Sequence, residues 1–150
     1  MSRPAEIPPP LHPDQVALIE ESFTRVLRHK AALADLVYER YFVLDPQARE
    51  LFPPDLTAQR AKVMQALTSI VRSLHSDADL ARLAEGLARS HQRFDLTGQQ
   101  YEHMAEAIIG ALHDSLGAGL TDETRSSWQA AFDRLLPMVS DAQARLDAAD

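Results

Sequence analysis

Residues 80–91 of this chain read LARLAEGLARSH, and this stretch decides the fold. Its apolar side chains recur at steps of three and four residues, which places them on one face of an α-helix. They are Leu80, Leu83, Ala84 and Leu87. His91 continues the same face by one further turn, and an imidazole among apolar side chains needs a polar partner. That partner is either a main-chain carbonyl in an ordinary helical core or a metal ion, and the stretch leaves both interpretations open.

Prolines mark the ends of the predicted helices. Pro13 suits the first turn of a helix, where its missing N–H costs nothing. Pro46 opens a short helical turn, which Pro53 and Pro54 end. Residues 55–136 contain no proline, and apolar side chains recur at helical spacing along most of this part, with no strand-like alternation. The predicted divisions of the chain are a flexible Pro-rich tail at residues 1–12, an all-α domain at residues 13–146 and a frayed C-terminus at residues 147–150.

Composition restricts the class of protein. With 150 residues the chain is long enough for one domain that encloses a cofactor. It has no cysteine, which excludes a disulfide framework, a thiolate nucleophile and a cysteine metal site. The formal net charge of −7 disfavours nucleic acid or an anionic membrane as a partner. No stretch has the length and apolar character of a membrane span or a signal peptide, so we expect a cytoplasmic protein.

A set of chemically distinctive residues follows a fixed order along the chain. The set consists of Tyr38 in YERYF, Asp45-Pro46, Leu51-Phe52, Gln59 in QRAKVM, His91, Tyr101 and Trp128. This order resembles the globin family, and most closely the bacterial single-domain haemoglobins and the haem domain of flavohaemoglobins. The resemblance covers roughly residues 13–140 and implies a globin fold, which is a three-over-three helical sandwich around a haem pocket.

The resemblance also implies a site that holds b-type haem. His91 matches the histidine that binds the haem iron from below, and it is the predicted metal ligand. Phe52 matches the phenylalanine that packs flat on the haem, and Leu87 lies one turn before His91 on the same helix face. Because the chain has no cysteine, the haem is not attached through a thioether. The other predicted haem-binding residues are Gln59, Lys62, Val63, Leu67, Leu96 and Tyr101.

Two residues form the predicted catalytic pair. Tyr38 and Gln59 match polar positions on the distal side of the haem, where a hydrogen-bond donor inside apolar walls stabilises a partly charged bound gas. Taken singly, Tyr38 also fits an ordinary core position, and Gln59 and Lys62 also fit solvated positions. The order in which these residues occur along the chain favours positions at the haem for Tyr38 and Gln59. It also favours Lys62 as a partner of a haem propionate.

The function implied by the resemblance is reversible binding of dioxygen, nitric oxide and carbon monoxide, as in oxygen transport. With electrons from a reductase, the same site would oxidise nitric oxide to nitrate, which is nitric oxide detoxification. We expect that reductase to be a separate protein, because this sequence contains no flavin, nicotinamide or signalling domain. The alternative is a globin-fold interaction or regulatory module without haem. The sequence leaves the oligomeric state open between a monomer and a homodimer.

Overall fold

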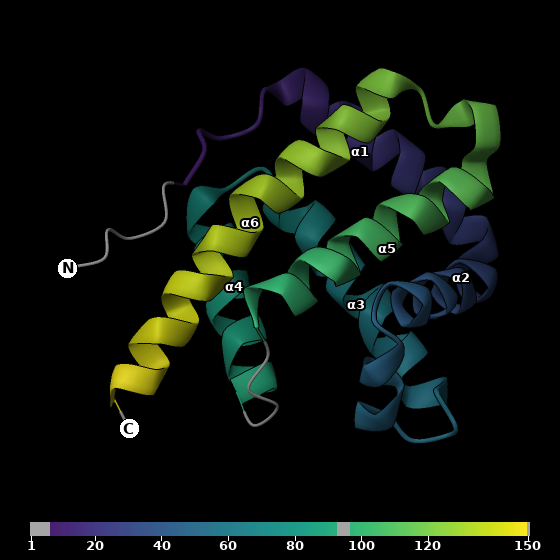
Figure 1. Ribbon diagram of the computed structural model, residues 1–150. Helices are drawn as coiled ribbons and strands as arrows, with labels where there is room; N and C mark the ends of the chain where they lie inside the picture. Colours follow the sequence, from purple (N-terminus) through teal and green to yellow (C-terminus); the bar gives the residue numbers. More distant parts are fainter. Residues whose placement is uncertain (1–6, 93–96, 150) are drawn as a thin grey trace.

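The computed structural model describes residues 7–92 and 97–149, which form six α-helices and three short 3₁₀ helices (Figure 1). Their bounds are α1 Pro13–Val26, η1 Leu27–His29, α2 Lys30–Leu44, η2 Pro46–Leu51, α3 Thr57–Ser73, α4 Asp77–His91, α5 Gly98–Leu116, η4 Gly117–Gly119 and α6 Asp122–Ala149. These described residues include no β-strand, so the predicted all-α class is confirmed.

Local side-chain chemistry sets the starts of the helices. At α1, Pro13 occupies the first position, and the side chain of Gln15 accepts a hydrogen bond from the N–H of His12 at 2.8 Å. At α5, the hydroxyl of Thr97 accepts from the N–H of Gln100 at 3.2 Å, and the Gln100 side chain accepts from the N–H of Thr97 at 2.8 Å. Each reciprocal pair satisfies main-chain N–H groups that have no partner inside the helix.

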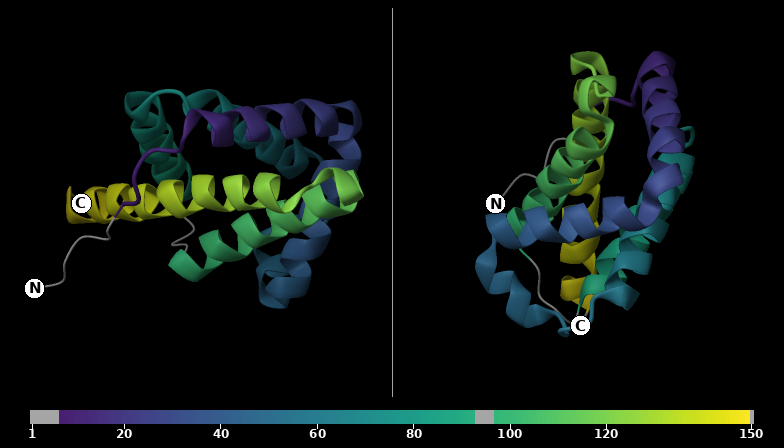
Figure 2. Two further views of the ribbon diagram at one scale, coloured as in Figure 1. Left: turned by 90° about the horizontal axis from the view of Figure 1, so that it is seen from above. Right: turned by 90° about the vertical axis from the view of Figure 1, so that its right-hand side faces the viewer.

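The α-helices pack in two layers. One layer consists of α1, α3 and α4, and the other of α2, α5 and α6. Figure 2 shows α6 running the length of the molecule, with α1 beside its first half. This arrangement is the three-over-three sandwich that the sequence predicts. None of the described helices has both the length and the apolar character that a membrane span requires.

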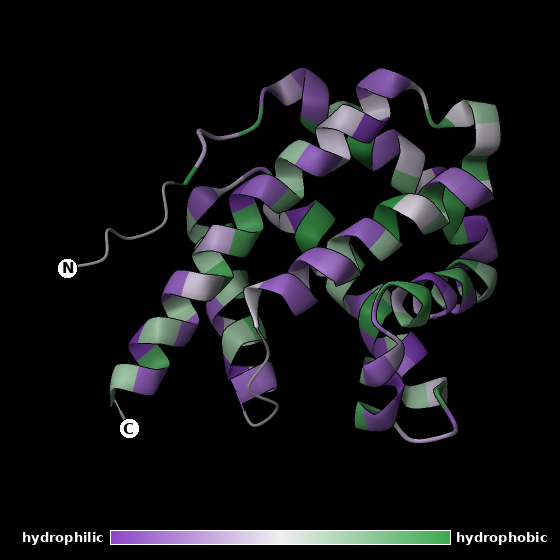
Figure 3. Ribbon diagram, in the orientation of Figure 1, coloured by the Kyte–Doolittle hydropathy of each residue, from purple (hydrophilic) through white to green (hydrophobic). Residues whose placement is uncertain are grey.

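The core between the layers is centred on Trp128 of α6. Its side chain is fully buried, and its indole N–H donates to the hydroxyl of Ser22 of α1 at 2.9 Å. Phe23 meets the indole edge-on at 6.3 Å between ring centroids, and Phe132 stacks on it at 6.4 Å. Apolar and polar residues alternate along the helices in Figure 3, as expected where one face of each helix is buried. Trp128 therefore joins the two layers through both apolar contact and a hydrogen bond.

Helix α4 has two inward rows of side chains where the sequence suggests one stripe. The buried row is Leu80, Ala84 and Ala88, and the half-buried row is Leu83, Leu87 and His91. The two rows differ because residues four apart lie on one line along a helix, whereas a step of three moves to the adjacent line. The row that contains His91 is thus left partly uncovered by protein.

Helix α6 is longer than its sequence suggests. It contains Pro137 without ending there, since an internal proline removes one main-chain hydrogen bond but leaves the others of the helix. It continues to Ala149, into the segment 147–150 that we expect to be frayed. A helix end that frays still has helical geometry part of the time, so the expected fraying stays a prediction.

We predict that Ser22→Ala lowers the free energy of unfolding by about 1–3 kcal/mol, because the buried indole N–H of Trp128 loses its acceptor. The chain has one tryptophan, so its fluorescence during urea unfolding measures the effect directly. Ser126→Ala, at an exposed position of α6, is the control and should change the stability by less than about 0.5 kcal/mol. Equal stabilities of the two variants would contradict the structural role of this hydrogen bond.

Candidate haem-binding site

His91 is the last residue of α4, and its ring is half-buried. Its Nδ1 lies 2.7 Å from the main-chain carbonyl oxygen of Leu87, one turn earlier. A carbonyl oxygen can only accept, so Nδ1 must carry the proton, and Nε2 is left with a lone pair. The hydroxyl of Ser90 is also near Nδ1, at 3.3 Å. The contact with a carbonyl, one of the two interpretations of the sequence, is therefore present, and it leaves Nε2 able to bind a metal ion.

Tyr101 lies beside His91. It belongs to the first turns of α5, and the two rings meet edge-on with centroids 5.9 Å apart. The hydroxyl of Tyr101 is buried and has no hydrogen-bond partner among the described residues. Burial raises the pKa of this phenol. Tyr101 therefore places an unsatisfied polar group near the imidazole.

Helix α3 presents a row of predicted site residues. Gln59, Val63 and Leu67 follow at intervals of four, so they share one face of the helix. Val63 and Leu67 are buried and Gln59 is half-buried. The side-chain oxygen Oε1 of Gln59 is itself buried, and within the described residues nothing bonds it. The row thus begins with an unsatisfied polar atom and continues with two apolar side chains.

Tyr38 of α2 reaches toward the start of this row. Its side chain is 6% exposed, and its hydroxyl donates to the main-chain carbonyl of Gln59 at 3.1 Å. The structure therefore links the side chain of Tyr38 to the main chain of Gln59. Burial, and secondarily the nearby Tyr41, raises the pKa of Tyr38 to about 12. The phenol consequently keeps its proton at neutral pH and remains a donor.

Phe52 follows η2 and joins an aromatic group with Tyr38 and Phe42. Its ring is half-buried, with centroids 5.7 Å from Tyr38 and 5.6 Å from Phe42. Arg49 stabilises this corner, because its guanidinium lies over Phe42 at 5.2 Å and donates to the carbonyl of Pro53 at 3.0 Å. No sequence pattern singles out Arg49, because in the polar stretch PQARE it resembles any solvated arginine. Its role depends on a loop shape that no local pattern encodes.

Two predicted haem-binding residues add little to the described geometry. Lys62 is exposed, and within the described residues it has no ion-pair partner, which fits a solvated side chain and a propionate partner equally well. Leu96 lies outside the described residues.

The residues present fit a haem. His91 offers a free Nε2, Phe52 and the row from Val63 offer apolar surface, and two buried polar atoms are unsatisfied, in Gln59 and Tyr101. Buried polar atoms in folded proteins almost always have a partner, so the two in Gln59 and Tyr101 are compatible with a bound group at this site. Two further such atoms among the described residues, in Arg60 and His103, are not part of the predicted site. Iron that is held by a macrocycle requires few protein ligands, and one imidazole is enough.

Comparison with known proteins agrees with this geometry. The Globin family model matches residues 35–139, which is more than half of the chain, and the chain therefore belongs to the globin family. Globins are haem proteins that bind diatomic gases. Haem and gas binding are thereby established at the level of the family.

Individual relatives are distant. A flavohemoprotein of Xylella fastidiosa (strain 9a5c) is 24% identical over 135 residues, covering 88% of this chain and 34% of the relative. A globin-like protein of Aquifex aeolicus (strain VF5) is 23% identical over 125 residues, covering 83% of this chain and 88% of the relative. A neuroglobin of Dissostichus mawsoni is 23% identical over 142 residues, covering 85% and 89%. The chain spans about a third of the length of the flavohemoproteins that it matches.

We predict that the tyrosines of the folded protein ionise above the ordinary pH of 10. The chain has three, and the pKa is raised to about 12 for Tyr38 and also raised by burial for Tyr41 and Tyr101. Between pH 10 and about 12 the unfolded chain loses phenol protons that the folded chain keeps, so the stability falls as the pH rises through this window. Ultraviolet absorbance of the phenolate and urea unfolding at each pH measure the two effects.

In Tyr38→Phe, the fall in stability between pH 10 and about 12 should be smaller than in the parent protein. If all three phenols of the folded protein titrated near pH 10, the burial of these side chains would be contradicted.

Proposed function

We propose that this globin is a haem-b protein that reversibly binds dioxygen and other diatomic gases, with its iron held by Nε2 of His91. The observation that carries the proposal is the 2.7 Å contact between Nδ1 of His91 and the carbonyl oxygen of Leu87. That contact fixes the tautomer and the orientation of the ring, as partners of metal-binding histidines generally do. When bound, the haem would supply the iron to which the gas binds, and His91 would hold that iron.

Apolar side chains would enclose the haem. We assign Phe52 and Leu87 to its packing and Val63 and Leu67 to the distal wall, because these residues are buried or half-buried on helix faces toward the interior. A dry pocket strengthens polar interactions with the bound gas, since the local dielectric is low. Lys62 is the proposed partner of a propionate.

The distal donors are Tyr38 and Gln59. The hydroxyl of Tyr38 has one proton, which it donates to the carbonyl of Gln59 in the structure. To stabilise a bound gas, the phenol would have to leave the neutral carbonyl of Gln59 and donate to the partly charged gas instead. The side-chain amide of Gln59 contributes a second donor, because its buried Oε1 has no partner that would hold the amide elsewhere among the described residues.

The similarity to the globin part of flavohemoproteins supports a second activity, oxidation of nitric oxide. One nitric oxide, one dioxygen and one electron combine to one nitrate, and the site would require a reductase to supply the electron. Nitrate production by the purified globin with an added flavin reductase tests this activity. Nitric oxide consumption that is no faster than autoxidation would leave gas binding alone. We also propose that the protein is cytoplasmic. We propose that it is a monomer or a homodimer.

We predict that His91→Ala does not hold stoichiometric haem, because the anchor of the iron is removed. Visible absorbance after reconstitution with haem measures occupancy, and added imidazole should restore part of the spectrum by filling the gap. His75→Ala, at an exposed histidine that pairs with Glu20, is the matched control and should bind haem like the parent protein. A normal haem spectrum of His91→Ala without imidazole would overturn the assignment. A parent protein that binds no haem would instead favour the alternative, a haem-free interaction module.

We predict that Tyr38→Phe speeds dioxygen release by roughly three- to thirtyfold. A hydrogen bond to a charged acceptor contributes about 1.5–3 kcal/mol, and part of it is offset because the phenol regains the carbonyl of Gln59 at about 1 kcal/mol. Carbon monoxide carries less charge when bound and should respond much less. Gln59→Leu should have the smaller effect of the two on dioxygen. Stopped-flow release rates measure all of these, and equal changes for both gases would mean that Tyr38 acts by shape.

A further inference from the structure

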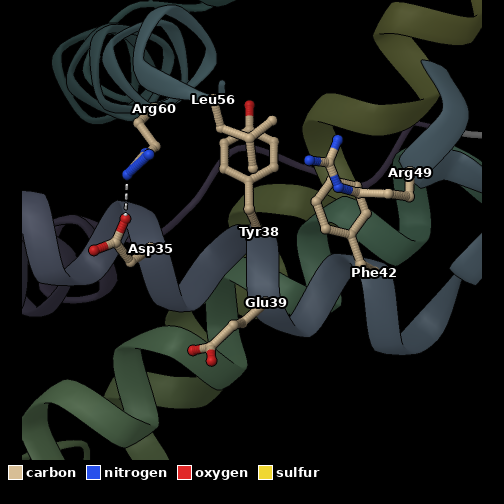
Figure 4. A pocket seen from close by; sticks show the side chains of 7 residues that line it. All are labelled: Asp35, Tyr38, Glu39, Phe42, Arg49, Leu56 and Arg60. Atoms are coloured by element: carbon tan, nitrogen blue, oxygen red, sulfur yellow. Dashed lines mark hydrogen bonds and ion pairs between the residues drawn. The ribbon is translucent and has the colours of Figure 1, made fainter. Parts of the chain in front are cut away.

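A cavity of about 460 Å³ opens between α2 and the start of α3. Figure 4 shows the side chains that line it, among them Tyr38 and Phe42 of α2 and Leu56, the residue before α3. Tyr38 belongs both to this wall and to the aromatic group around Phe52, from which its ring centroid is 5.7 Å away. The phenol ring is therefore common to the cavity and to the aromatic group that contains Phe52.

An ion pair joins α2 and α3 beside this cavity. Nη1 of Arg60 lies 2.8 Å from Oδ1 of Asp35, as the dashed line in Figure 4 marks. The same two residues also line a neighbouring cavity of about 870 Å³, so the ion pair lies between two cavities at the interface of α2 and α3. The side chains are 37% and 57% exposed, and exposed ion pairs contribute little to stability. The pair can therefore open without disturbing the fold.

Two side chains form the inner wall. That of Leu56, which precedes α3, is half-buried and apolar, while the start of the helix is held by Asp55, whose Oδ1 accepts from the N–H of Thr57 at 3.0 Å and from its hydroxyl at 2.6 Å. Tyr38 is held to α3 by one hydrogen bond, to the carbonyl of Gln59. That bond places the phenol beside the residue that begins the distal row. A small apolar molecule that passes between Tyr38 and Leu56 thus arrives at Gln59.

We propose that this cavity is an access route for diatomic gas, with Tyr38 and Leu56 as its inner constriction and the Arg60–Asp35 pair as its outer one. The inference rests on the proposed gas-binding function. An apolar constriction admits dioxygen, nitric oxide and carbon monoxide but excludes ions, because an ion would lose its hydration there. Leu56 and Asp35 are thereby assigned a role in the rates of gas exchange and none in affinity.

The first test fills the constriction with Leu56→Trp in the haem-loaded protein. Carbon monoxide association after photolysis and carbon monoxide release should both slow by the same factor, about three- to tenfold, because only the barrier changes. The affinity should then stay constant. Leu74→Trp is the matched control, since Leu74 is a half-buried leucine at the other end of α3 and should leave both rates unchanged. Slower release with unchanged association would overturn the proposal, because it would mean that Leu56 acts on the bound gas.

The second test opens the outer constriction with a surface substitution that leaves the core intact. Asp35→Asn should raise the association and release rates together. Asp114→Asn is its control, because it breaks the comparable pair between Asp114 and Arg40 of α2, which lies away from the cavity. Equal rates in Asp35→Asn and the parent protein would remove the ion pair from the proposal.

Xenon gives a readout that does not depend on gas binding at the iron. Under xenon pressure, the methyl signals of Leu56 in the nuclear magnetic resonance spectrum of the haem-loaded protein should shift more than those of Leu74. If Leu56 did not respond to xenon and Leu56→Trp left both carbon monoxide rates unchanged, the route would be wrong while haem binding stood. Failure of the parent protein to bind haem would overturn both proposals, and the test with His91→Ala identifies that case.

Discussion

The hydrogen bond between the imidazole of His91 and the carbonyl of Leu87 is the contact on which the proposed chemistry depends. It forms within one helix, so its geometry requires only that α4 continue to its last residue. The donor must be Nδ1, because the acceptor is a carbonyl, and the consequence is a free lone pair on Nε2. A local helical contact thus determines which atom is available to iron.

The position of that imidazole in the fold is set from the opposite end of α4. Arg134 of α6 is buried, and it donates to Asp77 in the first turn of α4 at 2.9 Å. The same guanidinium also bonds the carbonyl of Pro8, so it joins the N-terminal segment to both helices. A buried arginine requires such partners, because an unpaired charge in the core costs far more than an exposed one. With its start tied to α6 and its buried row packed in the core, α4 directs its half-buried row toward the proposed haem.

The parts of the fold that the sequence predicts correctly depend on local chemistry. Pro13 marks a helix start, where the capping bonds are made within one turn, and helical spacing identifies the apolar faces. Tyr38, Arg49 and Arg60 behave differently, because each has partners supplied by a separate element. Which acceptor Tyr38 finds depends on how α2 meets α3, and spacing along either helix does not contain that information. The resemblance to globins predicts Tyr38 as a site residue, while its hydrogen-bond partner became apparent only from the structure.

The partner that Tyr38 finds changes how its contribution to gas binding is understood. A phenol facing an empty apolar pocket would give the bound gas its full hydrogen-bond energy, whereas a phenol bonded to a main-chain carbonyl gives only the difference between two bonds. That difference is positive for dioxygen, which is partly charged when bound, and small for carbon monoxide, which is not. If Tyr38 faces the bound gas as proposed, the gas would have to be a stronger hydrogen-bond acceptor than the carbonyl of Gln59 to attract the phenol. Because burial keeps the phenol protonated up to a pKa of about 12, this comparison is the same across the physiological pH range. On the proposed function, a preference for dioxygen would then be set by the geometry between α2 and α3, the same interface in which the access route is proposed.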